Sequence, residues 1–284
     1  MNLSSARRRR SGAPRGFRPR RSRGQNLLVD AGVAEQIIAA AQIEPDSAVL
    51  EIGAGTGVLT RPLAGMAGQV VAVEVDAELA IALRRRLRGY PNVAVLRRDA
   101  RALDLEQIFP DRPYQVVANL PYSVGTPLLV DLLHSRNRPK RLTVMLQREV
   151  AERICADPGD WSALTVMTRP FGDARIEFLV PPSAFWPRPK VTSAVISVET
   201  TGRDRKDPQV ASAIWLSRHA FAQRRKKLVN SIAAGLRLER DAAVNLLTAA
   251  GIDPDDRPAN LDLPAWLALS DAFREEVAGA DGCG

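Results

Sequence analysis

The chain has 284 residues, enough for one large domain and a smaller one, and its 45% apolar and 25% charged residues match an average globular protein, which excludes a wholly disordered chain. No stretch reaches the roughly 20 apolar residues of a membrane span, the N-terminus lacks the apolar core of a secretory signal, and two cysteines are too few for a disulfide framework, so we expect a cytoplasmic protein. The formal net charge is +8, and its distribution along the chain is more informative than its size.

The first 23 residues hold nine arginines and no acidic residue. Subtracting these nine from the 40 basic residues leaves 31 against 32 acidic ones, so the rest of the chain is nearly neutral. We expect residues 1–23 to be a disordered arginine-rich tail that binds a polyanion. A merely solubilising arm is one alternative. An organelle transit peptide is another, although Pro14 and Pro19 interrupt any amphipathic helix.

Helical and strand patterns alternate after the tail. The apolar spacing over residues 34–41 predicts a helix, and short apolar runs then predict buried strands. The expected strands are residues 48–52, 69–74, 93–96, 114–118, 141–146, 176–180 and 191–198. Helix-compatible segments lie between most of the earlier ones, and this alternation indicates a parallel doubly wound sheet that ends near residue 200.

The composition changes after residues 202–208. Helical patterns follow over residues 209–234, 240–250 and 263–277, without strand signals. We therefore expect an α/β domain over residues 24–202 and a small all-helical domain over residues 203–284.

The first expected strand ends in a glycine-rich loop over residues 51–57, with Gly53, Gly55 and Gly57. Glycines let the backbone approach a ligand closely. A dinucleotide-binding loop would have its third glycine at position 58, where this chain has Val58. The spacing favours an S-adenosylmethionine loop over a pyrophosphate loop, and a tight turn without a ligand is the alternative.

Acidic residues follow the next two expected strands. Glu74 comes 21 positions after Gly53, close to the offset at which an acid binds ribose hydroxyls, so we predict that it holds the cofactor ribose. Asp99 is placed to accept a hydrogen bond from the adenine amine of the cofactor. The alternative for Asp99 is simple pairing with its neighbours Arg97, Arg98 and Arg101.

The fourth expected strand ends in Asn119, Leu120, Pro121 and Tyr122. An adenine amino nitrogen is a poor nucleophile because its lone pair is delocalised into the ring. The Asn119 side-chain oxygen and the Leu120 carbonyl can accept its two hydrogens and draw the lone pair out, while Pro121 fixes the turn and Tyr122 stacks on the base. This tetrapeptide predicts methylation of an exocyclic adenine amine, and a plain strand-ending turn is the alternative.

Together these motifs resemble the KsgA/RsmA family of ribosomal RNA adenine dimethyltransferases from about residue 24 to the C-terminal helices. The matching segments are residues 24–30, 51–57, 119–122, 146–153, 185–191 with Ser193, and 221–228. The resemblance implies a Rossmann-like class I methyltransferase fold. It implies dimethylation of two neighbouring adenosines near the 3′ end of small-subunit (16S) ribosomal RNA during ribosome biogenesis. Cofactor contacts are implied for Asn26, Leu28, Gly53, Gly55, Glu74, Asp99 and Asn119.

One departure from the family is Leu27, where members usually carry phenylalanine. This departure affects a packing contact over the cofactor entrance. We also hypothesise that Phe185, in a proline-rich loop, stacks on the extruded adenine opposite Tyr122.

Basic residues gather at Arg218, Arg224, Arg225, Lys226 and Lys227, on a segment that the pattern predicts to be helical. We interpret this basic segment as a contact for the RNA backbone, and a solvated basic face is the alternative. The expected partner is ribosomal RNA in the immature small subunit, bound by a monomer without a metal ion.

Three other functions are alternatives to this prediction. An Erm-type enzyme would methylate large-subunit RNA on the same scaffold, but Leu120 stands where that group usually has isoleucine. A non-catalytic assembly factor would not depend on Asn119. A small-molecule methyltransferase would need neither the basic segment nor the tail.

Overall fold

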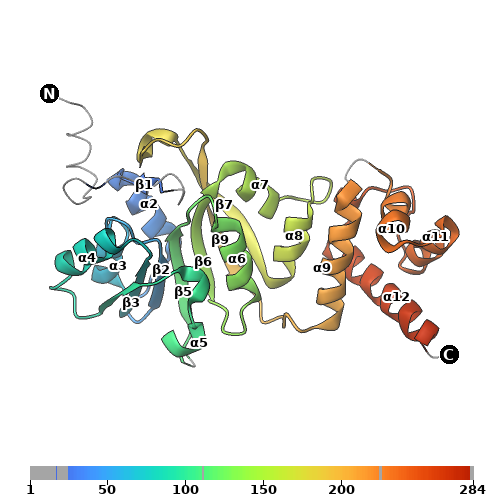
Figure 1. Ribbon diagram of the computed structural model, residues 1–284, viewed down its shortest axis with the longest axis horizontal. Helices are drawn as coiled ribbons and strands as arrows, with labels where there is room; N and C mark the ends of the chain where they lie inside the picture. The colour runs from blue at the N-terminus through green and yellow to red at the C-terminus, as the bar shows by residue number, and fades with distance from the viewer. Residues whose placement is uncertain (1–16, 18–24, 111, 224–225, 282–284) are drawn as a thin grey trace. The chain divides into compact units, whose positions relative to one another are not determined.

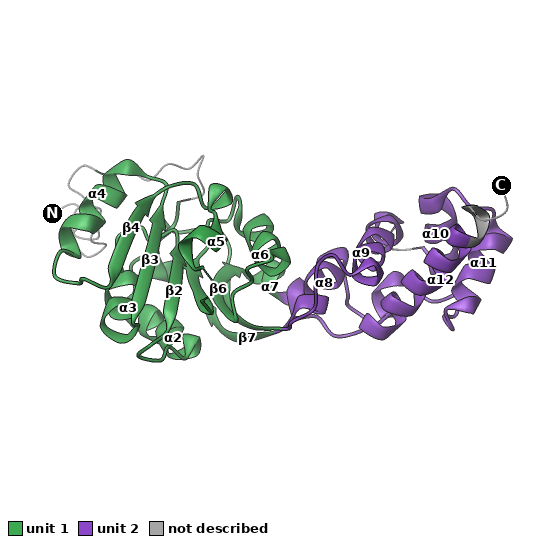
Figure 2. Cartoon of the chain, turned by 90° about the horizontal axis from the view of Figure 1, so that it is seen from below, with its two compact units in different colours: residues 1–151, 174–200 green, residues 152–173, 201–284 purple. Residues whose placement is uncertain are grey.

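A computed structural model of the chain describes residues 17, 25–110, 112–223 and 226–281 (Figure 1). Except for Phe17, the expected tail over residues 1–23 lies outside the described residues. The chain divides into two compact units, residues 1–151 with 174–200 and residues 152–173 with 201–284 (Figure 2). The sequence analysis placed residues 152–173 in the first domain. In the structure they belong to the second unit, because Trp161 and Val166 are buried in its core.

The first unit is built on a seven-stranded sheet in the order β4-β3-β2-β5-β6-β9-β7. The strands are β2 (Ala48–Ile52), β3 (Gln69–Glu74), β4 (Val93–Arg97), β5 (Tyr114–Asn119), β6 (Arg141–Gln147), β7 (Gly172–Val180) and β9 (Ser193–Thr200). Neighbouring strands from β4 to β6 are parallel, which confirms the α/β prediction. Mostly apolar runs form β2, β3 and β5 because both faces of a parallel sheet are covered.

Strand β9 corrects the expectation of an entirely parallel sheet, because it runs antiparallel to β6. The register places Arg141 opposite Glu199, and these two side chains form an ion pair. The buried Arg141 guanidinium also donates to the Gln42 side-chain oxygen at 2.9 Å and to the Ala40 carbonyl at 3.0 Å. These bonds satisfy most of a buried charge and connect β9, β6 and the end of the first long helix.

Helices pack against both faces of the sheet (Figure 1). In the first unit they are α2 (Ala31–Ala41), α3 (Thr60–Met66), α4 (Ala77–Arg86), α5 (Leu105–Ile108) and α6 (Gly125–His134), with α7 (Arg148–Ile154) at the boundary between the units. Carboxylates cap two of them: Asp30 accepts from the first turn of α2, and Asp76 from the first turn of α4.

A short antiparallel pair lies outside the main sheet. Strand β1 (Leu27–Leu28) faces β8 (Phe185–Trp186), with Leu28 opposite Phe185. Two residues per strand carry no periodic signal, so the sequence analysis did not predict either strand.

The second unit is helical, as expected. It contains α8 (Ala163–Thr168), α9 (Pro208–Ala220), α10 (Leu228–Leu236), α11 (Arg240–Ala249) and α12 (Leu263–Asp281), with short 3-10 turns at Arg169–Phe171, Phe221–Gln223 and Pro258–Asn260. The single helix expected over residues 209–234 is wrong, because α9 and α10 are separate. The Leu228 and Val229 N–H groups donate to the Asp256 and Pro254 carbonyls at 2.7 and 3.1 Å, so α10 starts afresh there.

Gly125 allows α6 to begin directly against the end of β5. A Cβ atom at this position would lie 3.1 Å from Leu120 Cβ and 3.2 Å from Leu146 Cδ2, both closer than ordinary contacts. At Gly65, within α3, an added Cβ would meet no atom within 4 Å.

We expect Gly125→Ala to lower the free energy of unfolding by about 1–3 kcal/mol, because overpacking forces the neighbours to move. The matched control Gly65→Ala should leave stability unchanged or raise it by about 0.5–1 kcal/mol, since alanine favours helix. Urea unfolding of both variants measures the difference. Equal stability of the two would show that the approach of α6 to β5 is not tight.

Candidate active site

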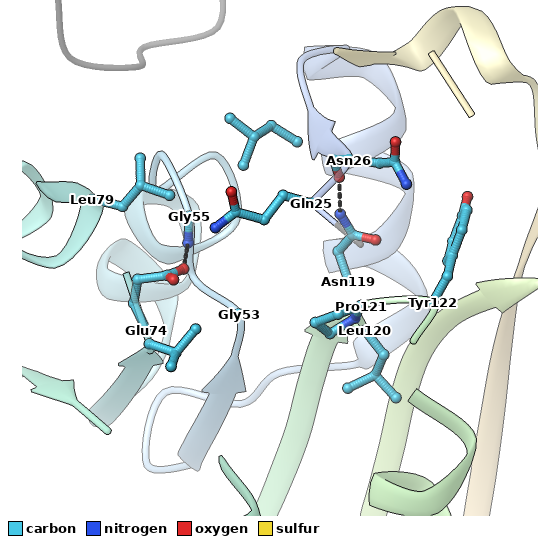
Figure 3. Close-up of a pocket in the computed structure, with 12 residues that line it drawn as sticks. Gln25, Asn26, Gly53, Gly55, Glu74, Leu79, Asn119, Leu120, Pro121 and Tyr122 are labelled. Atoms are coloured by element: carbon cyan, nitrogen blue, oxygen red, sulfur yellow. Dashed lines mark hydrogen bonds between the residues drawn. The ribbon is translucent and has the colours of Figure 1, made fainter. Parts of the chain in front are cut away.

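A cavity with several polar lining residues opens where the strand order reverses. Strands β2 and β5 are neighbours, and Ile52 pairs with Ala118, so Gly53 and Asn119 emerge from the sheet side by side. Ligands of open α/β sheets bind at this switch point. The cavity has a volume of about 70 Å³, and its lining includes Asn26, Gly53, Gly55, Glu74, Asn119, Leu120, Pro121 and Tyr122 (Figure 3). The structure therefore brings together most of the predicted site residues.

The glycines of the loop after β2 adopt backbone angles that side chains rarely allow. Gly53 has φ of 74° and Gly55 has φ of 56°. A Cβ atom at Gly53 would lie 3.4 Å from the Asn119 carbonyl oxygen, and one at Gly55 would lie 3.3 Å from Leu27 Cδ2. Side chains here would fill the space between the two strand ends, so glycine keeps the cavity open.

Glu74, at the end of β3, is 5% exposed and holds this loop in place. Its two carboxylate oxygens accept the Gly55 and Asp76 N–H groups, each at 2.8 Å. Burial raises the pKa of Glu74, and the two N–H donors oppose that rise. Each carboxylate oxygen has a further lone pair for a ligand hydroxyl, so Glu74 fits the predicted role at a ribose.

A second buried acid, Glu51 in β2, is absent from the residues that the sequence analysis assigned to the site. Its Oε2 atom has no hydrogen-bond partner among the described residues. A small cavity of about 20 Å³ is lined by Glu51 together with Leu28, Gly53, Gly55 and Asn119. Burial raises the pKa of Glu51 to about 8, and the nearby Glu74 adds to this rise. An acid inside an otherwise apolar strand was the signal that could have identified it.

A larger cavity of about 340 Å³ adjoins the same strand ends. Its lining includes Gly53, Val75, Asp99, Arg101 and Pro121. Three hydrogen bonds join the Arg101 guanidinium to the Asp99 carboxylate, the shortest at 2.6 Å, and these side-chain bonds lower the pKa of Asp99. Asp99 therefore lines a cavity wide enough for a purine, but an adenine amine would share its carboxylate with Arg101.

These features fit S-adenosylmethionine. Two positive-φ glycines form a cradle that a Cβ would fill, and Glu74 offers acceptors for hydroxyls. The unpaired buried oxygen of Glu51 offers an acceptor for a cationic group. Leu28 is buried and lines the small cavity beside Glu51, which is where it can contact a ligand.

The Asn119 side chain has a fixed orientation. Its Nδ2 atom donates to the Asn26 carbonyl at 3.1 Å, which leaves the side-chain oxygen on the side of Tyr122 (Figure 3). The amide therefore presents an acceptor, not a donor, to the space between Asn119 and Tyr122.

A tight turn follows Asn119. The Leu120 N–H donates to the Met145 carbonyl at 3.2 Å, and its side chain is buried. The Pro121 carbonyl accepts the Val124 and Gly125 N–H groups at 3.1 and 2.7 Å, which joins the turn to α6. These bonds hold the tetrapeptide rigidly at the strand end.

Tyr122 is half-buried beside the cavity, and its hydroxyl forms a 2.5 Å hydrogen bond with the Ser193 hydroxyl. Burial raises the pKa of Tyr122, so the phenol stays neutral at physiological pH. The bond to Ser193 in β9 fixes the direction of the ring. Ser193, which the sequence analysis named only as part of the family resemblance, is thus a support for the site.

The structure corrects the role expected for Phe185. Its side chain is 1% exposed and lies in the core of the first unit, packed among apolar residues that include Leu28 and Val180. A ring in this position cannot stack on a base. Pairing of β8 with β1 turns Phe185 inward, and its neighbour Trp186 is the partly exposed aromatic residue.

The predicted RNA-binding residues lie at a helix connection in the second unit. Arg218 is exposed on the last turn of α9, and Lys226 is exposed before α10, while Arg224 and Arg225 lie outside the described residues. Lys227 Nζ is 2.8 Å from Asp255 Oδ2, so part of its charge is already compensated.

The described residues contain neither a candidate membrane span nor a candidate metal centre. None of their helices is long and apolar enough to cross a membrane. No group of three or more His, Cys, Asp or Glu side chains among them is arranged to hold a metal ion.

Comparison with known proteins agrees with this geometry. The profile of the family described as ribosomal RNA adenine dimethylase matches residues 16–274. The ribosomal RNA small subunit methyltransferase A of Dehalococcoides mccartyi is 38% identical over 257 residues, covering 89% of this chain and 88% of the relative.

Two solved structures are also similar. A dimethyladenosine transferase from Plasmodium falciparum has a TM-score of 0.76 and 27% identity, with 88% of this chain and 98% of that one covered. The 23S rRNA methyltransferase ErmE has a TM-score of 0.70 and 29% identity, with 88% of this chain and 100% of that one covered.

The raised pKa of Glu51 predicts a dependence of stability on pH. The folded state holds a proton at Glu51 up to about pH 8, whereas the unfolded state releases it near pH 4.5. This contribution is fully present below pH 4.5 and is lost as the pH rises to about 8. The free energy of unfolding should therefore fall by up to about 1.4 kcal/mol per pH unit in that window.

Glu51→Gln, which mimics the protonated acid, should lack this decline. Urea unfolding of the parent and of Glu51→Gln at pH 5 to 9 measures the difference between their free energies of unfolding. Glu74 titrates in both proteins, so its contribution largely cancels in that difference. Parallel stability curves would mean that Glu51 is not the buried titrating group.

Proposed function

Because the chain belongs to the ribosomal RNA adenine dimethylase family and is therefore an S-adenosylmethionine-dependent methyltransferase, we propose that it converts two adjacent adenosines of small-subunit ribosomal RNA to N6,N6-dimethyladenosine. The two adenosines lie near the 3′ end of that RNA. The fixed orientation of the Asn119 amide carries this proposal.

Residues at three strand ends hold the cofactor. Glu74 accepts hydrogen bonds from the ribose, and Asp99 accepts one from the adenine amine. Gly53, Gly55 and the backbone of Asn26 surround the remaining part of the cofactor. S-adenosylmethionine supplies an electrophilic methyl group on a sulfonium sulfur.

Asn119 and Leu120 prepare the nucleophile. The two acceptors, the Asn119 side-chain oxygen and the Leu120 carbonyl, bind the two hydrogens of the adenine N6 amine. This geometry withdraws the lone pair from the ring and directs it at the incoming carbon, and the effect is greatest as the nitrogen becomes tetrahedral. No general base is required for the attack, because the nitrogen becomes acidic only once it is methylated and then loses its proton to water. The C–S bond would break as the N–C bond forms, so that the cofactor would leave as a neutral thioether.

Tyr122 binds the base itself. An adenine must leave its stack to reach a cavity of this kind, and flipped bases are held by flat side chains. The neutral Tyr122 ring, fixed by Ser193, offers one such face beside Asn119. With Phe185 in the core, the partner on the opposite face of the base comes from another residue.

Small-subunit RNA is favoured over large-subunit RNA by the relatives. The Dehalococcoides protein, named for the small subunit, is 38% identical, whereas ErmE, named for 23S RNA, is 29% identical. The Plasmodium enzyme is 27% identical, so the solved structures alone do not separate the two substrates.

The polar site at the strand ends argues against a purely structural assembly factor, which would not need an oriented Asn119. A small-molecule substrate would not need the exposed cations near α10. In this function the protein acts as a monomer, in the cytoplasm, on immature small subunits.

Methyl transfer to unmethylated small subunits, naked small-subunit RNA and large-subunit RNA tests the substrate. We expect dimethyladenosine, identified by mass spectrometry, only in small-subunit material. Methyl transfer to large-subunit RNA would instead assign the chain to the Erm-type group. Tight subunit binding without any transfer would support the assembly factor.

Asn119→Ala should lower kcat by at least about 100-fold, because it removes an acceptor that acts chiefly in the transition state. The affinity for S-adenosylhomocysteine should change little, because the lost acceptor acts on the amine of the substrate adenine. Single-turnover transfer and calorimetry measure the two quantities, and Asn119→Asp tests whether an acceptor oxygen is sufficient. Normal turnover of the alanine variant would refute the mechanism.

Arg218 and Lys227 should differ in their contributions to RNA binding. Arg218→Gln should weaken binding and lower the slope of log K against log salt by roughly one unit, as expected for one phosphate contact. Lys227→Gln should have a smaller effect because Asp255 already neutralises this lysine. Filter binding over a salt series measures both, with Arg205→Gln as an exposed control of equal charge. Equal slopes for Arg218→Gln and the control would remove Arg218 from the interface.

A further inference from the structure

Phe17 lies within the arginine-rich segment, yet it is only 3% exposed. It forms a small apolar cluster with Leu27 and Leu79, and Trp186 packs against the same cluster. Its sequence neighbours include Arg15 and Arg18, so it is a buried aromatic residue in a strongly basic stretch. A tail that served only to carry charge would not need such an anchor.

The partners of Phe17 belong to the cofactor cavity. Leu27 and Leu79 both line the cavity that contains Glu74 and Asn119. They come from β1 and α4, two elements that are distant in the sequence. Phe17 thus bridges two walls of the cavity from outside.

Leu27 connects this outer cluster to the ligand-binding atoms. Its Cδ2 atom lies 3.3 Å from the position that a Cβ would take at Gly55. The Gly55 N–H in turn donates to the Glu74 carboxylate at 2.8 Å. Contacts therefore run from the Phe17 ring through Leu27 and Gly55 to the acid that we assign to the ribose.

We infer that Phe17 is a positioning residue of the S-adenosylmethionine site. It packs on Leu27 and Leu79 and holds the glycine loop and Glu74 in their binding geometry. A leucine at position 27 fills less space than an aromatic residue, and Phe17 completes the apolar layer above it. This inference rests on the proposed function, because it concerns the cofactor of that reaction.

Loss of the ring should loosen the cavity walls and reduce their preorganisation for the ligand. We expect Phe17→Ala to raise the Kd for S-adenosylhomocysteine by about 3- to 10-fold, and the KM for S-adenosylmethionine in parallel. The kcat at saturating cofactor should stay within about 2-fold of the parent, since the reacting groups at Asn119 are untouched.

Calorimetric titration of S-adenosylhomocysteine into the full chain and three variants tests the inference. Phe17→Leu should restore most of the affinity, because leucine still covers Leu27 and Leu79. Deletion of residues 1–16, which removes five arginines but keeps Phe17, is the matched control and should leave the Kd unchanged.

Equal Kd values for Phe17→Ala and the parent would overturn the inference. So would an equal loss of affinity on deletion of residues 1–16, or a fall in kcat without a change in KM. Failure of the parent chain itself to bind S-adenosylhomocysteine would overturn the proposed function as well, so the two failures are distinguishable.

Discussion

The parallel pairing of β2 with β5 is the constraint on which the site depends. With Ile52 opposite Ala118, the glycine loop and Asn119 leave the sheet at the same level. A shift of one residue would turn Asn119 to the other face of the sheet. The register is secure because both strands are buried on both faces, so any shift would also misplace apolar side chains.

Two buried acids make this site electrostatically unusual. Burial raises the pKa values of Glu51 and Glu74, and the charges of Glu74 and Asp76 add to the rises at Glu51 and Glu74 respectively. A cationic ligand relieves that cost, because it favours the charged forms of both acids. The ionised forms of Glu51 and Glu74 are therefore more stable beside a positive charge than without one. This preference suits a sulfonium cofactor better than an anionic dinucleotide.

Features encoded in contiguous residues could be predicted from the sequence. Strands β2 and β3 coincide with the expected ranges because their largely apolar runs end in glycines or an acid. Features that depend on distant partners could not. Phe185 carries no signal of the face it presents, which the two-residue pairing with β1 decides. The break between α9 and α10 depends on carbonyls at Pro254 and Asp256, and the burial of Phe17 depends on Leu79.

In the function that we propose, the chemistry and the contacts to RNA fall in two separately packed units. Asn26, Glu74 and Asn119 all belong to the first unit, whereas Arg218 and Lys227 belong to the second, and each unit has its own apolar core. Substitutions that alter exposed cations of the second unit therefore leave the register of β2 and β5 intact. A family can thus change the RNA that it recognises on a constant catalytic unit. The 23S rRNA methyltransferase ErmE shares this scaffold at 29% identity, which fits our proposal that the strand ends carry the methyl transfer and that substrate choice depends on other residues.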